Sequence, residues 1–106
     1  MEYVYIVRHK TFHLDENEEL QLRITTSVFR TIEGANESAL QTAIALLGFE
    51  NIYYGKERII VRSIEDSLSS DKAAAYKSFN VPCNWDEEGN RLEDDLIEVE
   101  KFRVQD

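Results

Sequence analysis

The sequence has few of the residues that cross-link or interrupt a small protein. Its 106 residues include one cysteine, one proline and four glycines. A single cysteine, Cys83, excludes an intramolecular disulfide, so we expect a reducing compartment, the cytoplasm. Because no Pro-rich or Gly-rich linker divides the chain, we expect one domain over residues 1–106.

Long hydrophobic runs and clustered positive charges are also missing. The longest apolar run, AIALLGF at 43–49, is much shorter than the roughly 20 residues that cross a bilayer. The first ten residues, MEYVYIVRHK, lack the basic start and the small-residue cleavage site of a secretory signal, so we expect none. The 12 Lys and Arg residues form no cluster, which argues against direct binding to nucleic acid or to an anionic membrane.

Negative charge is abundant and unevenly distributed. The formal net charge is -9, and residues 81–106 contribute nine acids and three bases, a net of -6. Such a concentration favours a recognition surface for a basic protein. The alternative is that the acidity only maintains solubility and a monomeric state.

Two strands are expected in the first third of the chain. Residues 2–12 are rich in Tyr, Val and Ile and apolar on both faces, which is typical of a central strand covered on each side. From Leu20 to Val28 apolar and polar residues alternate, which predicts a half-buried strand. The acidic segment HLDENEE between them predicts an antiparallel hairpin.

Two helices and further strands follow. Ala39, Leu40, Ala43, Ile44 and Leu47 recur at helical spacing, with Asn36 as the expected N-cap and Gly48 as the C-terminal cap. We expect a strand at Arg58–Ile64, with a further short strand at 51–54 left open. The remaining elements are a second helix capped by Ser69 or Ser70 and continuing to Phe79, a turn at Gly89-Asn90, and a last strand from Asp95 to Val104.

The predicted order is therefore β-β-α-β-α-β. It indicates an α+β protein in which two helices pack on a small antiparallel or mixed sheet of four to five strands.

Three stretches carry a resemblance to known domains: YVYIVRH, then TSVFRTIEGANESALQTAIALLGF, then RIIVRSIED. Together they resemble small bacterial and phage β-β-α-β domains of unknown function over residues 1–66. The resemblance implies the fold of this part and a phage or mobile-element setting. It implies no activity and no site residue.

No pattern in the sequence predicts a metal, a cofactor or a catalytic site. His9 and His13 are four residues apart, which on a strand separates them by roughly 13 Å, too far to share one ion. DENEE begins like a calcium loop but lacks the later glycine and glutamate. No P-loop, dinucleotide fingerprint or nucleophile elbow is present. We therefore read the protein as a non-enzyme, with a small enzyme using Cys83 and His9 or His13 as the alternative.

Binding remains the favoured function. We expect a small acidic protein that binds a basic partner, in its sharpest form a phage or mobile-element inhibitor that mimics nucleic acid. The alternatives are an acidic accessory protein, a homodimeric structural protein, or an edge strand charged only against aggregation. The candidate binding residues combine carboxylates of the last quarter with three aromatic anchors. They are Asp86, Glu87, Glu88, Glu93, Asp94, Glu98, Glu100, Trp85, Tyr53 and Tyr54.

The absence of a ligand set with workable spacing generates the first prediction. Thermal melts of the protein with and without a chelator should superimpose. A melting temperature that the chelator lowers by several degrees, and that one particular ion restores, would contradict it.

Overall fold

The computed structural model describes residues 2–48, 57–70 and 74–105. Its elements, in chain order, are β1 (Tyr3–Leu14), β2 (Leu20–Phe29), α1 (Ile32–Leu47), α2 (Glu57–Ser70), β3 (Tyr76–Val81) and β4 (Asp95–Arg103). All neighbouring strands are antiparallel, and the sheet order is β2-β1-β4-β3. The α+β class is confirmed, with a four-stranded antiparallel sheet and the element order β-β-α-α-β-β.

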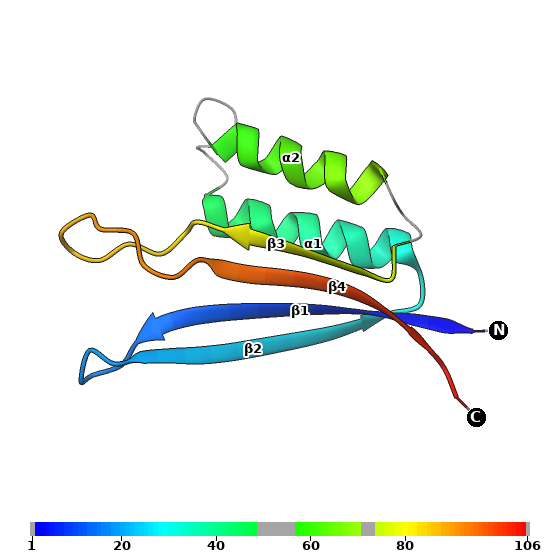
Figure 1. Cartoon of the computed structure of the whole chain (residues 1–106), viewed down its shortest axis with the longest axis horizontal. Coiled ribbons are helices and arrows are strands. Elements are labelled where there is room, and N and C mark those ends of the chain that lie inside the picture. The colour runs from blue at the N-terminus through cyan, green and yellow to red at the C-terminus, as the bar shows by residue number, and fades with distance from the viewer. Residues whose placement is uncertain (1, 49–56, 71–73, 106) are drawn as a thin grey trace.

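The two helices lie together on the β3 side of the molecule (Figure 1). α1 contacts all four strands, whereas α2 contacts α1 and, among the strands, only β3. The turn between β1 and β2 and the long connection between β3 and β4 lie at one end of the sheet, and both ends of the chain lie at the other (Figure 1). The molecule is thin, measuring 51 × 34 × 17 Å along its principal axes.

The core lies between α1, α2 and one face of the sheet. Alternate residues of the strands point into it, as the two-residue period of a strand requires. Small residues of α1 at four-residue spacing allow this helix to approach the sheet closely. The core residues are Val7, Ala35, Ala39, Ala43, Leu47, Val61, Ile64, Leu68, Phe79, Val81, Ile97 and Val99.

α1 begins earlier than the sequence pattern indicated. Its N-cap is Thr31, whose side-chain oxygen accepts a hydrogen bond from the backbone N–H of Gly34 at 3.1 Å. The expected N-cap, Asn36, is therefore wrong, because Thr31 already supplies the capping oxygen. The C-terminal cap at Gly48 is confirmed, with a φ of 86° that favours glycine.

The strand expected at Arg58–Ile64 is wrong, because this segment belongs to α2. Val61, Ile64 and Leu68 are the buried residues of α2, and their spacing of three and four places them on one helical face. The run of β-branched residues at 59–61 favours a strand locally, and packing of this face against the core outweighs it. The further short strand at 51–54 lies outside the described residues.

The second helix expected up to Phe79 is also wrong, because residues 76–81 form β3. Phe79 and Val81 point into the core, and Tyr76 and Ser78 point away from it, which is a strand alternation. Lys77 donates hydrogen bonds to the carbonyls of Ser67 and Leu68. Positive charge at the end of α2 is favourable there because the last carbonyls of a helix lack intrahelical partners.

β2 differs from its prediction in burial, although its position in an antiparallel hairpin is confirmed. Leu22 and Ile24 are each 51% exposed, so the strand is not half-buried. β2 is the edge of the sheet, and its apolar residues point to the face opposite the helices. The central position of β1 is confirmed, but helices cover only one of its two faces.

Ile97 provides a test of this core. It lies on the central strand β4 with no exposed surface, so Ile97→Ala should lower the free energy of unfolding by about 2–5 kcal/mol. The matched control is Ile59→Ala on α2, where 73% of the residue is exposed and the change should stay within about 0.5 kcal/mol. Equal losses in denaturant melts would contradict this core.

Candidate functional site

Two acidic loops meet at one end of the sheet. The first spans residues 15–19, between β1 and β2, and the second spans residues 82–94, between β3 and β4. The antiparallel register pairs Lys10 with Leu96, so the end of β1 lies beside the start of β4. The two loops, which we call the acidic end, contain nine acids and one arginine. Their net charge of -8 is nearly the whole net charge of -9.

An open groove of about 570 Å³ lies between the two loops. Leu14, Leu20 and Leu92 are the apolar residues of its lining. The other lining residues are charged and come from both loops, namely Glu18, Arg91, Glu93 and Asp94. The groove therefore combines apolar surface with an excess of carboxylates.

Each loop is held in shape by one aspartate. Asp15 accepts hydrogen bonds from the backbone N–H groups of Asn17 and Glu19, each at 2.9 Å. In the second loop Asp86 accepts from the backbone N–H groups of Glu88 and Asn90, at 2.9 and 2.7 Å. Hydrogen bonds from the backbone lower the pKa of both aspartates. The largest contribution comes from the backbone of Glu19 for Asp15 and from the backbone of Asn90 for Asp86. These two carboxylates hold the loops in shape, whereas the glutamates of both loops are exposed.

Asp95 fastens the second loop to the sheet. Its carboxylate is completely buried and meets His9 Nε2 at 2.6 Å, Thr11 Oγ1 at 2.9 Å and Asn84 Nδ2 at 2.7 Å. Asn84 also donates to the carbonyl of Glu93 across the loop. Burial alone would raise the pKa of Asp95, but the hydrogen bonds from Asn84, His9 and Thr11 lower it overall. The loop thus rests on a buried, fully partnered carboxylate.

Cys83 lies beside the same carboxylate. Burial first, and then the charge of Asp95, raise the pKa of the Cys83 thiol to about 11. The thiolate is the reactive form of cysteine, so a thiol with this pKa is a poor nucleophile at neutral pH. His9 is held by Asp95, and His13 lies exposed near the end of β1. This geometry gives no support to the alternative of cysteine chemistry.

Six of the candidate binding residues come together in the second loop. Trp85 is 57% exposed, so it is not part of the hydrophobic core. Asp94 is paired with Arg91 by two hydrogen bonds of 3.0 and 2.7 Å. The side chains of Glu87, Glu88 and Glu93 have no partner among the described residues. The six residues are Trp85, Asp86, Glu87, Glu88, Glu93 and Asp94.

Glu98 and Glu100 do not belong to this group, because cationic side chains of β1 pair with both of them. Glu100 accepts a hydrogen bond from Arg8 at 2.8 Å. Glu98 is only 6% exposed; its Oε1 lies 2.6 Å from Lys10 Nζ, and its Oε2 accepts from the Tyr76 hydroxyl at 2.6 Å. The Oε1 contact is an ion pair without hydrogen-bond geometry. Tyr53 and Tyr54 lie outside the described residues.

Sequence reasoning missed the contribution of the first loop and the leucines of the groove. Glu18 is 70 or more residues from Leu92 and Glu93 along the chain, yet all three line the groove. The available signal was the strand character of both MEYVYIVRHK and LIEVEKFRVQ. Antiparallel pairing of these two strands places the loop after the first beside the loop before the second.

Three further observations bear on function. In the stretches 2–48, 57–70 and 74–105, no three His, Cys, Asp or Glu side chains are grouped so that they could hold a metal ion. Neither described helix is long and apolar enough to cross a membrane. No family model matches the sequence, and no curated protein and no solved structure is significantly similar to it.

Asp95 generates a prediction about pH. Asp95→Asn should lower the free energy of unfolding at neutral pH by about 1.5–3 kcal/mol, the usual range for a hydrogen bond to a charged group. Because the folded protein lowers the pKa of Asp95 below its ordinary value of 3.8, the charged form stabilises the fold above that value. This contribution is lost as the pH falls through the folded pKa.

Denaturant melts at decreasing pH measure the difference between the wild type and Asp95→Asn. The difference should be constant down to the ordinary pKa of 3.8 and should shrink below it. Glu87→Gln, an exposed loop residue, is the control and should match the wild type at neutral pH. A difference that grows on acidification would contradict the buried pairing.

Proposed function

We propose that the protein is a non-enzymatic binding protein that docks a basic protein partner at its acidic end. The observation that carries the proposal is the distribution of charge. Two loops, one near each end of the sequence, line one groove and together have a net charge of -8. The rest of the chain is almost neutral, with 12 acids and 11 bases. A solubility device needs no such concentration, since charge spread over the surface serves that purpose equally well.

Electrostatics would act mainly on encounter. Charges at one end of an elongated molecule attract a basic surface and orient it during approach, which raises the association rate. Like-charged competitors are repelled by the same field. At physiological ionic strength the screening length is about 8 Å, so carboxylates of the two loops act together only because the sheet brings the loops side by side.

Apolar surface would supply the contact itself. Leu14, Leu20 and Leu92 line the groove, and Trp85 stands exposed in the second loop. Exposed tryptophan is a frequent anchor of protein interfaces. A partner segment that alternates Lys or Arg with aliphatic residues matches this combination of leucines and carboxylates in the lining.

A partner that itself binds nucleic acid is the sharper form of this proposal. Such proteins carry basic grooves that neutralise phosphates, and the acidic end offers carboxylates in their place. Excess DNA or RNA would then compete with the protein for its partner. The phage or mobile-element setting implied by residues 1–66 stays a prediction.

The test uses two variants with the same change in charge. Glu18→Lys with Glu93→Lys reverses two residues that line the groove, and Glu65→Lys with Asp66→Lys reverses two exposed residues of α2. Each protein is immobilised, exposed to host lysate, and its retained proteins are identified by mass spectrometry. Basic proteins should be retained by the wild type and the α2 variant and lost from the groove variant. Stability should change by less than about 0.5 kcal/mol in either variant, because the residues are exposed.

The affinity and the association rate of a partner identified in this way are then measured at different salt concentrations. Its affinity should fall by at least about tenfold between physiological salt and about 1 M, where the screening length is about 3 Å. Most of the loss caused by the groove variant should lie in the association rate. A partner that binds the groove variant as tightly as the wild type, in low and in high salt, would refute the proposal.

A further inference from the structure

One face of the sheet carries no layer of protein among the described residues. Since Val7, Ile97, Val99 and Phe79 point toward the helices, their strand neighbours point the other way. We call this the open face. It comprises Val4, Ile6, Arg8, Lys10, Phe12 and Leu14 of β1, Leu20, Leu22, Ile24, Thr26 and Val28 of β2, Tyr76, Ser78 and Asn80 of β3, and Leu96, Glu98, Glu100 and Phe102 of β4.

The open face is exposed and mostly apolar along β2, whereas most of its β1 and β4 residues are partly buried. Leu22 and Ile24 are each 51% exposed and Val28 is 62% exposed. On the neighbouring β1, Ile6 and Phe12 are only partly buried. Contiguous apolar patches of this kind are rare on monomeric proteins and mark interaction surfaces.

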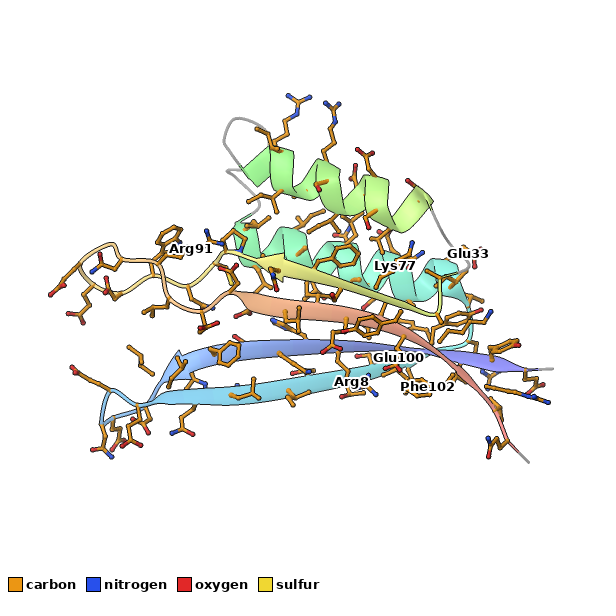
Figure 2. The ribbon with its side chains drawn as sticks, in the orientation of Figure 1. Arg8, Glu33, Lys77, Arg91, Glu100 and Phe102 are labelled. Carbon is orange, nitrogen blue, oxygen red and sulfur yellow. The ribbon has the colours of Figure 1, made fainter. Side chains whose placement is uncertain are left out.

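The charges of the open face are already paired within the chain. Arg8 binds Glu100 at 2.8 Å and Lys10 meets Glu98 at 2.6 Å. The Arg8 guanidinium also lies over the Phe102 ring, 5.6 Å from its centroid, and Figure 2 shows Arg8, Glu100 and Phe102 close together beside β4. Two cations and two anions make this face neutral although the chain carries -9. Covering it leaves no charge unpaired, so the cost of removing these ionic groups from water is partly offset by the pairs that they already form.

We propose that the open face binds a second copy of this chain, forming a symmetric dimer. A basic partner gains nothing on a face whose charges cancel, whereas two neutral faces meet without repulsion. The inference rests on the open face rather than on the acidic end, although Leu14 and Leu20 at the end of this face also line the groove.

The size of the face agrees with a dimer. The strands contain 12, 10, 6 and 9 residues, and at about 3.4 Å along a strand and about 4.8 Å between strands they present about 600 Å². Two copies therefore cover about 1,200 Å², the lower limit of stable specific interfaces. Stacking the sheets about 10 Å apart turns each thin two-layer molecule into half of a four-layer helix-sheet-sheet-helix particle.

Charge also selects the direction of the second copy. With the two sets of strands running the same way, the acidic ends would meet, each with a net charge of -8. The opposite direction places them at opposite ends of the dimer, well beyond the screening length of about 8 Å.

Sedimentation velocity over a series of protein concentrations tests the dimer. The wild type should show a species of twice the chain mass that persists in about 1 M salt, because apolar contact and internally paired charges do not depend on long-range fields. Ile24→Lys places a charge in the exposed apolar row that β2 contributes to the open face and should weaken self-association at least about tenfold. Thr25→Lys adds the same charge to the same strand on the opposite side and should leave self-association unchanged.

Circular dichroism is the control for folding. Both lysine variants should fold, because Ile24 and Thr25 are exposed positions on an edge strand. A wild type that stays monomeric at the highest concentrations would overturn the proposal. Equal weakening by Ile24→Lys and Thr25→Lys would also overturn it, since that result indicates pairing through the edge of β2. The variant Glu18→Lys with Glu93→Lys should still dimerise, which separates failure of this proposal from failure at the acidic end.

Discussion

The antiparallel pairing of β1 with β4 is the interaction on which the rest of the structure depends. It joins the first and last strands of the chain, from Tyr3 opposite Arg103 to Lys10 opposite Leu96. Through it the two hairpins become one sheet, which α1 covers on one face. The same pairing brings loop 15–19 beside loop 82–94, and sets Arg8 and Lys10 beside Glu98 and Glu100. Closing so long a loop is entropically costly, and burial of Val7 and Val99 between sheet and helices offsets that cost.

Local pattern predicted the elements whose packing agrees with their intrinsic preference. β1, β2, β4 and most of α1 follow alternation or helical spacing that is visible in the sequence. The segment of α2 was predicted as a strand and the segment of β3 as part of a helix. Both predictions are wrong because the intrinsic preferences of these residues conflict with their packing. The run Ile59, Ile60 and Val61 favours a strand, and the alanines before Tyr76 favour a helix. The secondary structure of these segments is decided by their buried residues, which are Val61, Ile64 and Leu68 in α2 and Phe79 and Val81 in β3. Which residues become buried depends on the whole fold.

The candidate site was half predictable for a similar reason. The carboxylates of loop 82–94 and the exposed Trp85 are evident in the sequence as a dense acidic segment around an aromatic residue. Glu98 and Glu100 belong to the same dense region, but their role depends on which cations lie across the sheet. Lys10 and Arg8 are about 90 residues away in the chain, and only the register of β1 with β4 places them there. The burial of Glu98 and its bond to Tyr76 follow from β3, an element that local pattern did not predict.

The aspartates that shape the two acidic loops have a thermodynamic consequence for recognition. A flexible acidic segment must lose backbone freedom when it binds, at a cost of about 1–2 kcal/mol for each residue that becomes fixed. Asp15 and Asp86 each tie two backbone N–H groups of their own loop, so much of that freedom is already lost in the free protein. A partner bound at the acidic end, as proposed, would therefore meet loops whose conformational entropy was already lost during folding, and its binding free energy would be correspondingly less diminished.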